Sequence, residues 1–143
     1  MPPSEPHFAE RGTTRDVEQA RTFQPKFNAE GLIPAIVSEA TTGAILMFAW
    51  MNAEALALTI ASRVAHFHSR SRGRLWKKGE DSGNLLSVVE MTTDCDQDVI
   101  AIKVVIAGAG VACHTGAHTC FYRTVDLGEP GAAGYTLSYP LAK

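Results

Sequence analysis

The sequence predicts a β-rich α+β domain with a small mixed or antiparallel sheet and one main helix. Short apolar runs rich in β-branched residues recur along the chain, which favours strands. Only the segment 52–63 combines a helix cap with a run of helix-forming residues. The 143 residues are 45% hydrophobic and carry a formal net charge of −2, which suits one ordinary domain and gives no general argument for nucleic acid or a membrane.

The two ends of the chain differ in composition from its middle. Residues 1–24 are polar and contain prolines and mixed charges, so we expect a loosely ordered arm with a short helix over 16–21. The predicted domain spans 25–128. Residues 129–143 begin with Glu-Pro-Gly and end in an apolar run, which predicts a tail that either adds an edge strand or frays.

Within the domain, the first half predicts a hairpin followed by the helix. Apolar runs at 32–37 and 44–50 flank Thr41-Thr42-Gly43, a typical turn sequence. Asn52 is a good cap for a helix that runs to about Arg63. The remaining predicted strands, which bring the total to about six, are 64–68, 85–93, 99–107 and 121–125.

A cluster of carboxylates, Asp94, Asp96 and Asp98, leads into the most β-branched of these runs. If it continues a strand, the three aspartates project from one face, and Cys95 and Gln97 project from the other. Carboxylates crowded on one face fit a hard cation such as magnesium. Solvated surface charge is the alternative. An EF-hand loop is excluded, since the sixth and twelfth positions are valines where glycine and glutamate are needed.

All three cysteines of the chain, Cys95, Cys113 and Cys120, lie beside polar residues. Their odd number argues against a disulfide framework, and free thiols predict a reducing cytoplasmic location. Three thiolates suit zinc and leave its fourth position open for water, as in catalytic sites. A fourth ligand from His114 or His118 would instead close a structural site.

The segment 68–84 concentrates positive charge on a nearly neutral chain. It holds three arginines, two lysines, three serines, three glycines and a tryptophan. Arginine forks, hydroxyls and exposed backbone amides together favour a phosphate group. A solvated loop and an RNA-binding segment are the alternatives.

Five motifs together resemble one known family. They are Ser69-Arg70-Ser71-Arg72, Leu75-Trp76-Lys77-Lys78-Gly79-Glu80, Ser82-Gly83-Asn84, Asp94-Cys95-Asp96-Gln97-Asp98, and Cys113-His114-Thr115-Gly116 followed by Cys120-Phe121. Their order and spacing, between about Leu32 and Tyr122, are similar to those of phosphoribosyl-AMP cyclohydrolase. The chain departs from the family at His68, where an aromatic residue is usual, and at Leu86, where glutamine is usual.

The resemblance implies a cytoplasmic hydrolase of histidine biosynthesis that adds water across the N1–C6 bond of phosphoribosyl-AMP. It implies one Zn²⁺ and one Mg²⁺ per subunit, in an intertwined homodimer whose sheets pack across subunits. Zinc is expected on Cys95 of one subunit and on Cys113 and Cys120 of the other. Magnesium is expected on Asp94, Asp96 and Asp98.

The remaining site candidates concern catalysis and substrate binding. His114, and after it His118, are candidates for acid–base catalysis because histidine titrates near neutral pH. Candidates for substrate binding are Arg70, Arg72, Trp76, Lys77, Lys78, Glu80, Ser82 and Gly83. We expect a small nucleotide and a second copy of the chain as partners, with no nucleic acid and no membrane. The rival hypothesis is a zinc-stabilised module that binds RNA or another phosphate.

Overall fold

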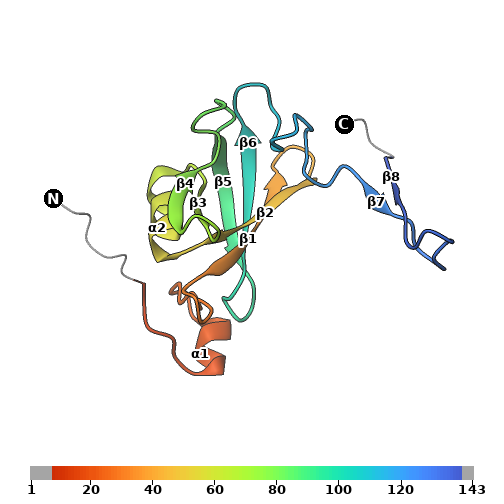
Figure 1. The fold of residues 1–143 in the computed structure, drawn as a ribbon. Coiled ribbons are helices and arrows are strands. Elements are labelled where there is room, and N and C mark those ends of the chain that lie inside the picture. Colours follow the sequence, from red (N-terminus) through yellow and green to blue (C-terminus); the bar gives the residue numbers. More distant parts are fainter. Residues whose placement is uncertain (1–7, 140–143) are drawn as a thin grey trace.

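A four-stranded sheet forms the centre of the computed structural model, which describes residues 8–139 (Figure 1). Its strands are β1 (Ile33–Glu39), β2 (Ile45–Met51), β5 (Leu86–Thr93) and β6 (Ile100–Ile106), in the order β2-β1-β6-β5. Two antiparallel hairpins, β1/β2 and β5/β6, lie side by side through a parallel pairing of β1 with β6. The prediction of a β-rich α+β domain with a small mixed sheet is confirmed.

The core lies against one face of this sheet. Side chains on the two central strands alternate between buried and more exposed positions, as the two-residue period of a strand requires. The fully buried ones are Ile33, Ala35 and Val37 on β1 and Ile100, Ile102 and Val104 on β6. This parallel pair is the most deeply buried part of the sheet and fixes the ends of β6, where the candidate site residues lie.

The main helix, α2 (Ala53–Ser62), begins and ends where the sequence predicts. The Asn52 side chain accepts a hydrogen bond from the Ala55 amide at 2.9 Å, and Arg63 ends the helix in the left-handed conformation. Ala55, Leu56 and Thr59 are its buried residues. The predicted hairpin turn before it is also confirmed, because the Gly43 amide donates to the Glu39 carbonyl at 2.8 Å.

The basic segment forms a second, two-stranded sheet, of which the sequence analysis predicted only the first strand. The strands are β3 (His66–Ser69) and β4 (Arg74–Lys77). Phe67 is fully buried, and its ring lies 5.2 Å from that of Trp76 across the hairpin. This packing anchors the hairpin to the core, and the charged side chains of the hairpin lie on its outer side.

The N-terminal segment packs against the domain where the sequence predicts a loosely ordered arm. Its helix, α1 (Thr14–Gln19), begins two residues before the predicted one, because Thr13 and Asp16 form a capping box. Phe8, Phe23 and Phe27 cluster at the edge of the core. Residues 1–7 lie outside the described part of the chain, and the predicted domain boundary stays a prediction.

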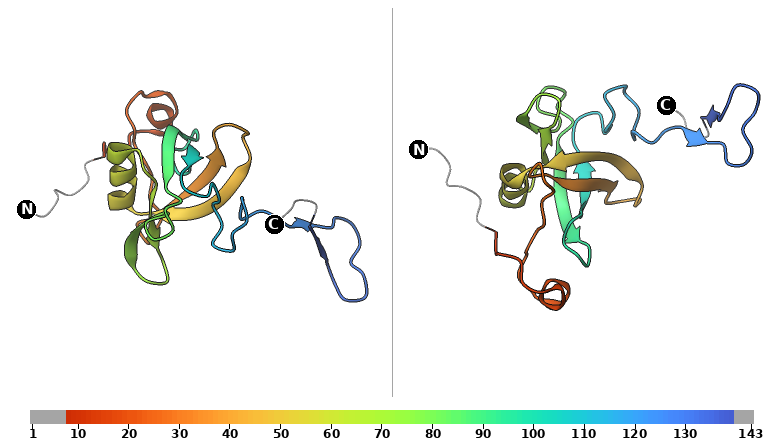
Figure 2. Two further views of the ribbon diagram at one scale, coloured as in Figure 1. Left: turned by 90° about the horizontal axis from the view of Figure 1, so that it is seen from above. Right: turned by 60° about the horizontal axis from the view of Figure 1, so that its bottom comes forward.

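The C-terminal segment forms a separate two-stranded ribbon outside the main body (Figure 2). Its strands are β7 (Thr124–Val125) and β8 (Leu137–Ser138). The predicted last strand is therefore shorter than expected, and the tail pairs with it and not with the main sheet. The last four residues, 140–143, lie outside the described range. None of the helices in the described residues is long and apolar enough to cross a membrane.

Candidate active site

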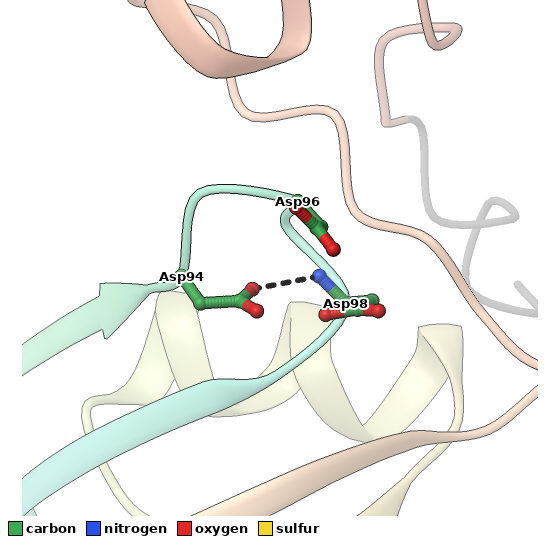
Figure 3. A group of neighbouring side chains, drawn as sticks. All are labelled: Asp94, Asp96 and Asp98. Atoms are coloured by element: carbon green, nitrogen blue, oxygen red, sulfur yellow. Dashed lines mark hydrogen bonds between the residues drawn. The ribbon is translucent and has the colours of Figure 1, made fainter. Parts of the chain in front are cut away.

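The three aspartates lie in the loop that joins β5 to β6, and the prediction that they continue a strand is wrong. β5 ends at Thr93, and the chain turns because the Asp94 carboxylate accepts hydrogen bonds from the backbone amides of Asp98 and Val99, at 3.0 and 3.2 Å. The turn nevertheless brings the three carboxylates together (Figure 3). One oxygen from each lies within 4.8 Å of the others.

Hydrogen bonds and neighbouring charges within this cluster change the pKa values of two of the carboxylates. The pKa of Asp98 is raised, first by its hydrogen bond with the Asp94 side chain, then by desolvation and by the negative charges of Asp94 and Asp96. Desolvation acts to raise the pKa of Asp94, but its hydrogen bonds with Asp98 and Val99 lower it on balance. A hard divalent cation accepts such oxygen ligands and would relieve the repulsion, so the donor set fits magnesium.

Cys95 lies on the same loop and does not point away from the aspartates as the strand geometry predicted. It is exposed, and its thiol donates to the Asp96 carboxylate at 3.2 Å. That hydrogen bond and the charge of Asp96 raise the pKa of the Cys95 thiol. The prediction failed because it assumed an extended backbone, whereas Gln97 has a positive φ of 55° and turns the chain.

Cys113 and Cys120 lie close together in the segment that follows β6. Each thiol influences the pKa of the other, and the Thr115 hydroxyl donates to the Cys113 sulfur at 3.0 Å. Desolvation opposes ionisation of Cys113, but the hydrogen bonds from Thr115 lower the pKa of its thiol on balance. Burial raises the pKa of Cys120 to about 11. Cys113 therefore ionises more readily than Cys120, and a pair of thiolates is a donor set that zinc accepts.

The third cysteine lies at the other end of the sheet. β6 separates the Cys95 loop from the Cys113–Cys120 segment, and its seven residues span roughly 20 Å at the usual rise of a strand (Figure 1). In the described part of the chain, the only group of three side chains close enough to hold a metal ion is the aspartate cluster. One chain therefore does not bring its three thiols together.

The two candidate histidines differ in their surroundings. Both ring nitrogens of His118 are engaged, Nδ1 with the Gly110 carbonyl and Nε2 with the Glu39 carboxylate, each at 2.9 Å. Glu39 raises the pKa of His118 first, and the Gly110 carbonyl adds to the effect. His114 is exposed beside Cys113. His118 therefore anchors the cysteine segment to β1 through Glu39. The sequence analysis does not predict this role for Glu39.

A basic pocket of about 550 Å³ lies over the β3/β4 hairpin. Six of the predicted substrate residues line it: Arg72, Trp76, Lys77, Lys78, Glu80 and Ser82. The other two do not. Arg70 lies over the Trp50 ring, 5.0 Å from its centroid, and Gly83 has a positive φ in the following turn.

The pocket also contains residues that were not predicted, and His68 is the most informative. Its Nδ1 is the single buried side-chain nitrogen or oxygen in the described residues that has no hydrogen-bond partner. Buried polar atoms are normally satisfied, so this atom indicates a place for a ligand group or water. Trp50 comes from β2, and only the fold brings it to the hairpin.

The family model described as phosphoribosyl-AMP cyclohydrolase matches residues 47–122 of the chain. The chain belongs to the phosphoribosyl-AMP cyclohydrolase family. A curated phosphoribosyl-AMP cyclohydrolase of Rhizobium rhizogenes is 60% identical over 117 residues, which cover 80% of this chain and 78% of the relative. The enzyme of the same name from Caulobacter vibrioides is 50% identical, over 85% of this chain and 87% of the relative. The predicted family, and with it the prediction of an enzyme, is confirmed.

The family match covers the site unevenly. In this phosphoribosyl-AMP cyclohydrolase family member, the matched residues 47–122 contain the basic pocket residues, the aspartate loop and all three cysteines. They exclude Glu39 and the whole N-terminal segment. The likeness to the curated relatives extends further, because 117 aligned residues of a chain of 143 must include Glu39.

Proposed function

We propose that the protein opens the adenine ring of phosphoribosyl-AMP by hydrolysis of the N1–C6 bond, a step of histidine biosynthesis. The observation that carries this proposal is the match to the phosphoribosyl-AMP cyclohydrolase family over 47–122. The reaction bonds a water oxygen to C6, breaks the N1–C6 bond and places a proton on N1. It needs an activated water, a proton donor and a binding site for a phosphorylated nucleotide.

Zinc would be held by Cys113 and Cys120 of one subunit and by Cys95 of a second subunit. The distance between the two ends of β6 supports this arrangement, because one chain separates Cys95 from the other two thiols. When bound, zinc acts as a Lewis acid that lowers the pKa of a coordinated water to near 7. The arrangement requires a homodimer, and exposed apolar side chains such as Val89 and Phe121 offer surface for association.

Magnesium would be held by Asp94, Asp96 and Asp98, whose clustered oxygens support the assignment. Magnesium commonly binds one or two carboxylates together with substrate phosphates. The aspartate loop is therefore the proposed partner of one substrate phosphate. Because its pKa is raised, Asp98 begins to bind a proton at a higher pH than an ordinary aspartate. At acidic pH a cation must displace this proton in order to bind.

The basic pocket would hold the other phosphate. Arg72, Lys77 and Lys78 line it and supply charged donors, of which arginine binds phosphate oxygens in pairs. His68 lines the same pocket and adds an imidazole ring to its polar groups. Trp76 lines the same pocket and offers a ring face for the base.

His114 is the proposed donor of the proton to N1. It adjoins Cys113, a proposed zinc ligand, and it is exposed, whereas both nitrogens of His118 are held by Gly110 and Glu39. We expect His114→Asn to lower kcat by about a hundredfold or more, with normal zinc content, because general acid catalysis contributes at least that factor.

His118→Asn is the matched control for this prediction. It should lower thermal stability and zinc retention, because it releases the cysteine segment from Glu39 and Gly110. The fraction of this variant that retains zinc should have the native kcat. Steady-state kinetics and metal analysis of both variants measure this. Unchanged turnover of zinc-loaded His114→Asn would contradict the role of His114.

A zinc-stabilised phosphate-binding module is the second candidate, and the arginine–serine–glycine composition of the basic hairpin favours it. The two candidates differ in turnover. An absorbance assay of phosphoribosyl-AMP ring opening by the zinc- and magnesium-loaded protein tests the enzyme directly. A folded, zinc-loaded dimer without turnover would favour the binding module. A cytoplasmic location belongs to the enzyme proposal, because three free thiols need a reducing compartment.

A further inference from the structure

Gln97 is the buried centre of the aspartate loop. Its side chain is only 5% exposed, and its backbone has a positive φ of 55°, which few residues other than glycine adopt. Such a conformation persists only where its surroundings hold it. The loop's own contribution is a 3.0 Å hydrogen bond from the Gln97 amide to the Asp94 carbonyl.

The other contacts of Gln97 come from the N-terminal strap, which we define as residues 11–26. The Gln97 side chain donates to the Val17 carbonyl at 2.9 Å and accepts from the Gln24 amide at 2.6 Å. The Gln97 carbonyl accepts from the Lys26 amide at 2.7 Å. Both polar ends of the buried amide and the backbone beside it are therefore satisfied by a segment more than seventy residues away in sequence.

Arg11 ties the strap directly to the aspartates. Its Nη1 donates to the Gln24 carbonyl at 2.8 Å and to the Asp96 carbonyl at 2.9 Å. The Gln24 side chain in turn accepts from the Gly12 amide at 2.8 Å. The N-terminal chain passes beside the aspartate loop (Figure 3). Its hydrogen bonds to the Asp96 carbonyl, the Gln97 carbonyl and the Gln97 side chain hold the loop in place.

We propose that the N-terminal strap positions the divalent-cation site, with Arg11, Gln24 and Gln97 as its positioning residues. Three carboxylates whose oxygens lie within 4.8 Å repel one another, and a free loop would relax to separate them. The strap holds the loop backbone in its turned conformation before a cation arrives. It therefore lowers the conformational cost of cation binding.

The inference rests on the proposed function, since it takes the aspartate loop to be the cation site. It goes beyond that function because it assigns a role to a segment that contains none of the proposed metal ligands or substrate-binding residues. The strap contacts the loop through its backbone and through Gln97, and no hydrogen bond or ion pair given by the structure joins a strap side chain to an aspartate carboxylate. Its effect on the cation is therefore one of position.

The test is a titration of the full-length protein with Mn²⁺ alone, followed by electron paramagnetic resonance. Arg11→Gln is the main variant, because Arg11 is exposed and its loss should leave the fold intact. Removing a positive charge near three carboxylates would by itself strengthen cation binding. We expect the opposite, a Kd for Mn²⁺ raised about tenfold, which is the usual effect of losing a residue that orients metal ligands.

Arg15→Gln is the matched control. It removes the same charge from the same strap, but Arg15 contacts only the Gln19 side chain. We expect its Kd to equal that of the native protein or to fall slightly. Arg11→Lys keeps the charge and a donor and should recover most of the affinity. Gln24→Ala is a second variant. It removes the acceptor of the Gly12 amide but keeps the backbone bonds of residue 24 to Gln97 and Arg11, so it should weaken Mn²⁺ binding less than Arg11→Gln does.

Two further measurements separate positioning from general stability. Zinc content and the midpoint of thermal unfolding of Arg11→Gln should stay close to the native values while the Kd for Mn²⁺ rises. Native-like Mn²⁺ affinity in both Arg11→Gln and Gln24→Ala would overturn the inference. So would a loss of affinity that follows a fall in the unfolding midpoint and is not recovered by Arg11→Lys.

Asp96→Asn distinguishes a failure of the strap from a failure of the proposed site. If the native protein binds Mn²⁺ and Asp96→Asn does not, the cation lies at the aspartate loop. The strap variants then test whether the strap positions it. Native protein without Mn²⁺ affinity, or affinity that Asp96→Asn leaves unchanged, would overturn the cation site and the strap's role together.

Discussion

A mixed dimer of one Cys95→Ser subunit and one Cys113→Ser subunit is expected to recover about half of the native activity, although each variant alone is inactive. If each zinc site takes Cys95 from one subunit and the thiol pair from the other, the mixed dimer has one site with both lesions and one intact site. The separation of Cys95 from Cys113 by the length of β6 leads to this expectation.

The measurement uses co-expressed subunits with two different tags, so that only the mixed dimer is purified and assayed. Zinc analysis should find about one ion per mixed dimer, against two in the native dimer. A mixed dimer of Cys113→Ser and Cys120→Ser is the control and should stay inactive, since each of its two sites then carries one lesion in its thiol pair. An inactive first pair would place all three thiols of a site in one chain.

Asp98→Asn is expected to lower magnesium-dependent activity by about a hundredfold and yet to stabilise the metal-free protein. A direct ligand should cost at least as much as the groups that orient ligands, which cost up to that factor. The stabilisation has a separate cause. Asp98 has a raised pKa next to Asp94, so the folded protein favours its protonated form, which the neutral asparagine resembles.

The pH dependence gives this prediction its sign. A carboxyl with a folded-state pKa above its unfolded value stabilises the fold at low pH and loses that contribution as the pH rises through the folded pKa. Native metal-free protein should therefore unfold at a lower temperature than Asp98→Asn at neutral pH. Added magnesium should raise the unfolding midpoint of the native protein and leave that of Asp98→Asn unchanged.

These effects are measured by thermal unfolding with and without magnesium, at neutral pH and at acidic pH values where Asp98 is protonated. Glu30→Gln is a suitable control, because Glu30 is an exposed carboxylate outside the aspartate loop. It should change neither the metal-free midpoint nor the response to magnesium. A metal-free Asp98→Asn variant less stable than the native protein would show that the Asp94–Asp98 contact stabilises the loop.

The sequence predicted the site through residue types, and it failed where conformation depends on distant contacts. The turn at Thr41–Gly43 and the cap at Asn52 are local signals, and both were read correctly. The strand expected over the aspartate cluster is absent, because the left-handed conformation of Gln97 is held by Val17 and Gln24, far away in the chain. No local pattern contains that information.

The same reason explains the residues that were missed. Trp50 reaches the basic pocket from another hairpin, and Glu39 meets His118 only because β1 and the cysteine segment end at the same side of the sheet. The N-terminal segment has the composition of a loose arm, yet Val17 and Gln24 are buried. The composition of a segment does not show which distant residues it will contact in the fold.

The parallel pairing of β1 with β6 also has a consequence for how the chain folds. Partners across it, such as Ala35 and Ile100, are 65 positions apart, so the pairing closes a long loop and contributes strongly to contact order. The two hairpins flanking it are local and can form early. The aspartate loop is the turn of the β5/β6 hairpin and can form with it. The contact between His118 of the cysteine segment and Glu39 of β1 instead requires that β6 has docked against β1, so the two proposed metal sites depend on different steps of folding.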